Sequence, residues 1–189
     1  MLKSRLCIAF FAFAVGCAPA QKPLTDYVNP MLGTATLWDS VDLGFKPTKR
    51  TWGAEVFPGS SLPNAMVQVS PVTKFHSGAG YQYEDSVIYG FTHTNKGHWN
   101  LCHIPLLPVT GTPTPGDYCS PFSHERESAA PGYYQVFLDR YGVDAQLSST
   151  LRCAFHKYTY PAGAAASLLA DLQRSNEHVR AWDIRKEGD

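Results

Sequence analysis

Residues 89–108, YGFTHTNKGHWNLCHIPLLP, contain two predicted strands and the connection between them. In residues 89–94, large side chains alternate with small ones, which is the period-2 pattern of a β-strand. Residues 104–109 form a short apolar run, and its prolines favour a strand at the edge of a sheet. Residues 95–100 show no periodicity. We therefore predict a surface loop between two strands.

This loop carries one large ring, Trp99, next to His98 and Asn100. An indole in a polar loop is costly to leave in water unless something packs against it. A sugar suits it, because the apolar face of a sugar stacks on an indole while its hydroxyls need amide and imidazole partners. We therefore interpret the loop as a carbohydrate contact.

Two other interpretations of the loop stay open. Trp99 can fold back as a lid on the sheet, with the histidines bonded to nearby backbone groups. Alternatively, His93, His98, Cys102 and His103 can bind zinc, although their irregular spacing disfavours this.

The rest of the chain predicts an all-β fold, an antiparallel β-sandwich. Aromatic residues reach 13% and charged residues only 17%, and Gly and Pro punctuate the sequence. A single helical turn is expected after Ser120 or Ser123. Eight to ten short strands are expected, including residues 26–34, 66–71, 80–83, 87–94, 132–138, 143–148, 151–160, 167–172 and the start of another at 182–185.

The N-terminus predicts export. Residues 1–16 combine a short basic start with an apolar run too short to span a bilayer, as in a signal peptide. Small residues precede Cys17, a pattern typical of a bacterial lipoprotein with a lipidated first cysteine. Residues 17–25 would then tether the domain at the periplasm, outer membrane or cell surface. Ordinary cleavage after Ala18 or Ala20 is the alternative.

Net charge and cysteine content limit the binding partners and the number of disulfides that the sequence predicts. Removing residues 1–16 takes away two of the 16 basic residues, so 14 face 16 acidic ones, a net charge of −2. No basic patch points to nucleic acid. Cys102, Cys119 and Cys153 remain after Cys7 and Cys17 are set aside; they allow one disulfide or three free thiols.

Taken in order, the motifs closely resemble the N-terminal domain of glycoside hydrolase family 92, the calcium-dependent exo-acting α-mannosidases of bacteria. The resemblance covers roughly residues 26–172. It is carried by VNPMLGT (28–34), FPG (57–59), MVQVSP (66–71), SVIYGFTHT (86–94), SPFSHE (120–125), PGYY (131–134) and FHKYTYP (155–161).

The resemblance implies a supersandwich-like N-terminal domain, here residues 26–189 and incomplete at its C-terminus, packed on an (α/α)₆ barrel that this chain lacks. It implies inverting hydrolysis of terminal α-mannose in glycans, which needs a carboxylic acid and a carboxylate about 6.5–9.5 Å apart. It also implies a Ca²⁺ that holds the sugar. Acid, base and most calcium ligands would lie in the barrel, so no catalytic residue or metal ligand is assigned here and this chain alone is expected to be inactive.

The candidate sugar-contacting residues are Trp99, His98, Asn95, His93, Gly33 and Glu55. The sequence departs from the pattern of many relatives at residues 63–66 and in the loop at 95–100. Linkage preference is therefore the property least safely carried over.

Three further alternatives remain. Catalysis by this chain alone would need two of its own carboxylates, and Glu55, beside an indole and a glycine, is the most interesting of them. The chain can instead be a lipid-anchored, non-catalytic carbohydrate-binding module. It can also be a truncated product that does not fold, since an open sheet edge favours aggregation. The other available carboxylates are Asp39, Asp42, Glu84, Asp85, Glu125 and Glu127.

Overall fold

The structure, a computed structural model, describes residues 21–36, 56–96 and 99–188, and the statements below concern these residues. The predicted signal peptide and the candidate residues Cys17, Glu55 and His98 lie outside them. Within the described part, no helix has the length and apolarity needed to cross a membrane.

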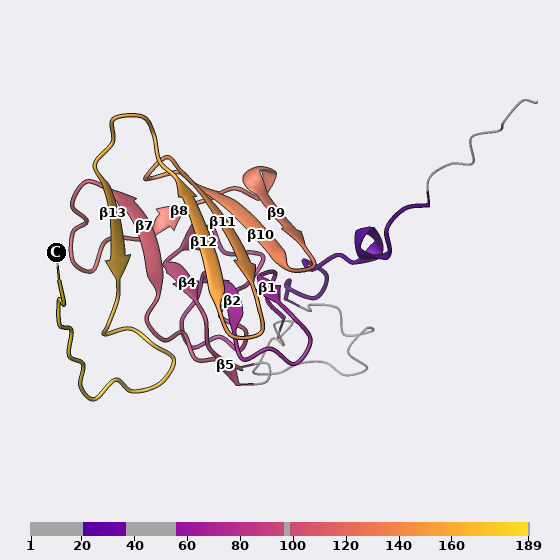
Figure 1. Cartoon of the computed structure of the whole chain (residues 1–189), viewed down its shortest axis with the longest axis horizontal. Coiled ribbons are helices and arrows are strands. Elements are labelled where there is room, and N and C mark those ends of the chain that lie inside the picture. The colour runs from indigo at the N-terminus through magenta and orange to yellow at the C-terminus, as the bar shows by residue number, and fades with distance from the viewer. Residues whose placement is uncertain (1–20, 37–55, 97–98, 189) are drawn as a thin grey trace, which may run out of the picture.

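Two antiparallel sheets form a β-sandwich, which confirms the predicted fold class (Figure 1). One sheet has the order β1 (Ser60–Ser61), β2 (Gln68–Val72), β4 (Gly90–Thr92), β7 (Leu106–Thr110), β13 (Ala166–Ala170). The other has the order β12 (Ala154–Thr159), β11 (Val143–Ser149), β10 (Tyr133–Leu138), β9 (Glu127–Ala130). Two small pairs join β3 (Val87–Ile88) to β8 (Ser120–Pro121), and β5 (Asn95–Lys96) to β6 (Trp99–Asn100).

The strict alternation in β10 and β11 builds the core. Along both strands, buried residues alternate with partly exposed ones, so one face of the four-stranded sheet packs inward. The inward side chains are at most 1% exposed, and burying each such aliphatic side chain stabilises the fold by about 1.5–3 kcal/mol. They are Tyr134, Val136, Leu138, Val143, Ala145 and Leu147.

The short helical turn is also where the sequence predicted it. The 3₁₀ helix η2 (His124–Arg126) begins after Ser123, whose side-chain oxygen accepts a 3.2 Å hydrogen bond from the backbone N–H of Glu125. This capping satisfies one of the free N–H groups at the start of the helix.

Three strand predictions are wrong. Residues 80–83 form no strand because Gly80 takes a left-handed φ of 76°. Residues 26–34 instead give the 3₁₀ helix η1 (Leu24–Tyr27), which follows Pro23, and then a turn. Residues 182–185 form no strand either.

The edge position predicted for residues 104–109 is wrong as well. Strand β7 lies between β4 and β13, and Pro108 stands opposite Leu168 of β13. The ladder with β4 has a single pair, Phe91 opposite Leu106. Because proline cannot donate a ladder hydrogen bond, the prolines shorten this ladder rather than moving the strand to the edge.

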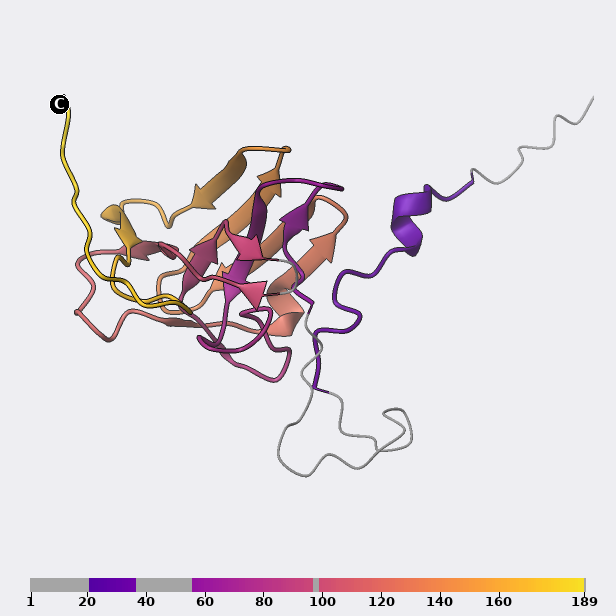
Figure 2. The ribbon, with the colours of Figure 1, turned by 90° about the horizontal axis from the view of Figure 1, so that it is seen from below.

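The N-terminal segment joins the sandwich only at its end. In Figures 1 and 2, η1 stands apart from both sheets, and it buries none of its residues. Contact with the sandwich begins at Met31, which packs against the core, and Thr34, which is 1% exposed. Residues 31–34 are therefore the point at which this segment is fixed.

Cys102, Cys119 and Cys153 are free thiols in the structure, which favours the second of the two predicted alternatives. Cys102 is buried, and burial raises its pKa to about 12. Cys153 is exposed and Cys119 is half-buried.

Candidate functional site

The predicted loop at residues 95–100 is a β-hairpin, which we call the Trp99 hairpin. Strand β5 pairs with β6, with Asn95 opposite Asn100 and Lys96 opposite Trp99. The tip, residues 97–98, lies outside the described residues. Trp99 is half-buried, so part of its indole remains accessible. This exposure is compatible with a sugar contact and with a lid, and both interpretations stay open.

Asn100 fixes the base of the hairpin. Its side chain is completely buried, and its carbonyl oxygen accepts a 2.8 Å hydrogen bond from the backbone N–H of Cys102. Its backbone N–H donates to the carbonyl of Gly78 at 2.8 Å, and its backbone carbonyl accepts from the Asn176 amide at 2.5 Å. The backbone of Asn100 and its side-chain oxygen thus bond to three segments, which holds the strand in one place, while its side-chain nitrogen has no partner among the described residues.

His93 follows β4 and meets the other sheet. Its Nε2 atom lies 2.8 Å from Nε2 of His156 in β12, and Nδ1 of His156 lies 2.6 Å from the hydroxyl of Tyr158. Burial lowers the pKa of His93. Burial and the neighbouring His93 lower the pKa of His156 to about 4. At neutral pH both rings are thus uncharged, and the N–H of one donates a hydrogen bond to the bare nitrogen of the other.

Gly33 lies in a tight turn at residues 29–34, which we call the Gly33 turn. The side-chain oxygen of Asn29 accepts from the N–H of Met31 at 3.0 Å, an Asx-type turn, and the N–H of Thr34 donates to the carbonyl of Met31 at 3.1 Å. Gly33 has a φ of 89°, a conformation that glycine adopts without strain. The turn therefore presents bare, exposed backbone at Gly33.

One short segment connects the Gly33 turn to the Trp99 hairpin. Tyr83 donates its N–H to the carbonyl of Thr34 at 3.1 Å, while Gly78 holds the hairpin base. An extended chain advances at most 3.3–3.6 Å per residue, so Gly78 and Tyr83 are at most about 17 Å apart. Between them, Gly80 must be glycine, because a Cβ there would lie 2.8 Å from the side-chain nitrogen of Asn100. The Gly33 turn and the base of the Trp99 hairpin are thus anchored to the same short segment.

Three of the candidate carboxylates are held in hydrogen bonds within the described part, while Glu125 is exposed and no hydrogen bond to its carboxylate is found. Glu84 accepts from the backbone N–H of Thr36 at 2.7 Å, and Asp85 accepts from the hydroxyl of Thr73 at 2.7 Å. The side chain of Glu127 is completely buried. None of the three is free to act as acid or base, while Asp39 and Asp42 lie outside the described residues with Glu55.

The described residues do not fit a calcium site. Among residues 21–36, 56–96 and 99–188, no group of three or more His, Cys, Asp or Glu side chains is placed to hold a metal ion. Calcium prefers six to eight oxygen ligands. We therefore derive no chemical step through calcium from this part of the chain.

A cavity of about 410 Å³ lies away from the candidate residues. It opens beside the end of β13 and is lined by Tyr118, Asp171, Arg174 and Trp182, among others. It contains neither Trp99, His93 nor Gly33.

Of the six candidate residues, the structure describes Trp99, His93 and Gly33 with their surroundings and Asn95 by its backbone. It brings His93 against His156, a partner that the sequence analysis missed. The alternation of β12 puts His156 on the same face as Tyr158, so its inward direction was readable from the sequence, but its partner was not.

Comparisons with known proteins agree with the fold. The sequence profile described as the Glycosyl hydrolase family 92 N-terminal domain matches residues 27–189. No curated protein matches the chain at a significant level.

Among solved structures, the chain is similar to the family GH92 α-mannosidase BT3965 from Bacteroides thetaiotaomicron in complex with mannoimidazole. The two share 31% identity with a TM-score of 0.68, over 82% of this chain and 20% of that one. The GH92 glycosyl hydrolase ccman5 is 29% identical, with a TM-score of 0.62, over 80% of this chain and 21% of that one. The inverting mannosidase BT2199 from Bacteroides thetaiotaomicron is 28% identical, with a TM-score of 0.62, over 80% of this chain and 20% of that one. The chain thus spans about a fifth of the length of these proteins.

Proposed function

Since the chain belongs to glycoside hydrolase family 92 and matches its N-terminal domain, we propose that it contributes to the sugar site of an exported exo-α-mannosidase that trims terminal α-mannose from glycans with inversion. The carrying observation is the match to the N-terminal domain over residues 27–189. The similarity to an α-mannosidase complexed with mannoimidazole and to an inverting mannosidase supports the substrate and the stereochemistry.

In this proposal, the Gly33 turn and the Trp99 hairpin border the sugar. The exposed backbone at Gly33 lets a sugar approach closely, because no Cβ stands in the way. Trp99 offers a stacking face for the next sugar, on the leaving-group side of the bond, and Asn95, His98 and His93 offer polar partners for hydroxyls. Glu55 is the sixth candidate sugar-contacting residue.

The chemistry itself belongs to a C-terminal barrel domain. Inverting hydrolysis needs an acid that protonates the leaving oxygen and a base that activates water. Glu84, Asp85 and Glu127 are engaged in other hydrogen bonds and Glu125 is exposed, and the family resemblance implies that the acid and base come from the barrel. Calcium, when bound there, would hold and distort the terminal sugar.

Location follows from the N-terminal sequence. Residues 1–16 are proposed to direct export, and lipid on Cys17 to anchor the enzyme at the periplasmic face of a membrane or at the cell surface. One acyl chain binds a membrane only marginally, so a stable anchor implies more than one.

Two assays test the proposal. The complete gene product should release mannose from an aryl α-mannoside as the β-anomer first, and a calcium chelator should abolish the release. The present chain alone should give no turnover under the same conditions. Turnover by residues 17–189 alone would show that the acid and base lie within this chain. Mannan binding without hydrolysis by the complete product would favour the carbohydrate-binding module instead.

A further inference from the structure

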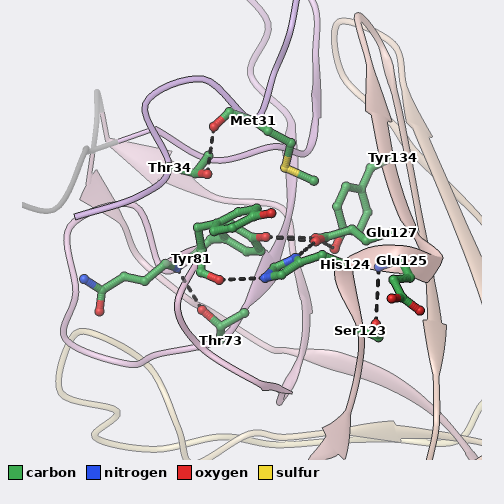
Figure 3. Close-up of polar contacts among 11 residues, drawn as sticks. Met31, Thr34, Thr73, Tyr81, Ser123, His124, Glu125, Glu127 and Tyr134 are labelled. Atoms are coloured by element: carbon green, nitrogen blue, oxygen red, sulfur yellow. Dashed lines mark hydrogen bonds and ion pairs between the residues drawn. The ribbon is translucent and has the colours of Figure 1, made fainter. Parts of the chain in front are cut away.

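A buried carboxylate and a partly exposed imidazole lie beside Met31 and Thr34 of the Gly33 turn (Figure 3). Glu127, in β9, has a side chain that is 0% exposed, and His124, in η2, has one that is 33% exposed. Glu127 accepts a 2.6 Å hydrogen bond from the hydroxyl of Tyr134, 3.0 Å bonds from that of Tyr81, and lies 2.5 Å from Nδ1 of His124. The carboxylate is thus surrounded by donors.

The two nitrogens of the His124 ring both face acceptors. Nε2 lies 2.7 Å from the backbone carbonyl of Tyr83, and Nδ1 faces Glu127. Nε2–H donates to the Tyr83 carbonyl, and Nδ1 and Glu127 share a hydrogen, so the ring bridges a backbone carbonyl and a buried carboxylate. Burial, and then the charge of Glu127, raise the pKa of Tyr81 and of Tyr134, which keeps both phenols protonated as donors.

This network reaches the Gly33 turn through Tyr83. The rings of His124 and Tyr83 stack with their centroids 3.9 Å apart and their planes 4° apart. The backbone of Tyr83 is held on its carbonyl side by His124 and donates from its N–H to the carbonyl of Thr34 at 3.1 Å. Met31 and Thr34 lie beside this cluster in Figure 3.

We infer that His124 and Glu127 are positioning residues that hold the Gly33 turn in place through the backbone and ring of Tyr83. A buried carboxylate that is bonded to three side chains can fix one arrangement of the groups around it, even where the bonds add little net stability. Here the arrangement that it fixes is the backbone of Tyr83, and through it the turn. That the turn borders the sugar rests on the proposed function.

The test uses the complete gene product with two variants that leave the buried carboxylate partnered. Tyr83→Ala removes the stacked ring and keeps the His124–Glu127 pair. His124→Asn keeps a donor toward Glu127 and removes both the stack and the bond to the Tyr83 carbonyl. In both, hydrogen exchange of the Leu32 and Thr34 amides should rise at least ten-fold, while amides of β10 and β11 stay protected.

Two control variants separate positioning from general destabilisation. Tyr83→Phe keeps the ring and the backbone, so it should behave as the unchanged protein. Tyr141→Phe removes a buried 2.6 Å hydrogen bond to the carbonyl of Tyr118, away from the turn, and should lower the melting temperature without loosening the turn.

Activity then separates this inference from the proposed function. If the turn loosens in Tyr83→Ala and His124→Asn and kcat/KM for an α-mannoside falls at least ten-fold, the positioning role and the sugar contact at Gly33 are both supported. If the turn loosens but kcat/KM is unchanged, the positioning role stands and the sugar contact at Gly33 is wrong. Unchanged exchange of Leu32 and Thr34 in both variants would overturn the positioning role.

Discussion

The contact between His93 and His156 predicts that acid weakens the sandwich. Their Nε2 atoms are 2.8 Å apart, so one ring donates and the other accepts. One added proton can be shared in this contact, but a second would place two N–H donors face to face. The pair therefore resists full protonation in the folded protein.

The size of the effect follows from the pKa of His156, which falls from 6.5 to about 4 on folding, chiefly through burial. Above pH 6.5, folded and unfolded chains are both neutral at this ring, and the contribution to stability is fully present. As pH falls from 6.5 to 4, the unfolded chain binds a proton that the folded chain does not, so stability is lost. The full shift would correspond to about 3.4 kcal/mol, but the ring is partly accessible to solvent, and screening reduces this to about 1–2 kcal/mol.

Calorimetric melting of the protein between pH 7 and pH 4 measures this loss. For a domain of this size, 1–2 kcal/mol corresponds to a melting temperature about 2–8 °C lower. His156→Gln, which cannot titrate, should flatten the slope between pH 6.5 and 4. His178→Gln replaces an exposed histidine and should leave the slope unchanged. An identical slope in the wild type and His156→Gln would refute the reasoning, as would a titration midpoint near 6.5 for His156.

Three other substitutions have definite expected outcomes. Trp99→Ala in the complete enzyme should lower kcat/KM on a natural disaccharide by an amount equivalent to about 1–3 kcal/mol and affect a small aryl mannoside much less; equal losses with a collapsed melting temperature would instead support the lid. Asn100→Ala leaves the buried N–H of Cys102 without its acceptor, so chemical denaturation should show a loss of about 1–3 kcal/mol, and an unchanged midpoint would contradict the anchoring role. Cys17→Ser should move the protein from the membrane fraction to the soluble fraction, and unchanged fractionation would rule out the lipid anchor.

Local patterns in the sequence predicted most of the sandwich. The alternation in residues 132–138 and 143–148 needs no distant partner to be recognised, and β10 and β11 are found there. The capping role of Ser123 is equally local. Predictions failed where a neighbouring segment or a single backbone conformation determines the structure. At Gly80 a left-handed φ ends the extended pattern, and β7 is not an edge strand because β13 pairs with it.

The candidate site was harder to predict because its geometry depends on polar residues that face inward. His93 meets a ring 63 residues away, Tyr81 a carboxylate 46 residues away, and the backbone carbonyl of Asn100 an amide 76 residues away. Nothing in a single sequence identifies such pairs, since each residue taken alone is read as a polar surface group. Yet these pairs fix the hairpin and the turn, because apolar packing has no direction and a buried hydrogen bond does. Substitutions in these polar networks should therefore alter sugar recognition without touching the sugar, and the His124 and Tyr83 variants measure this at the network around Glu127.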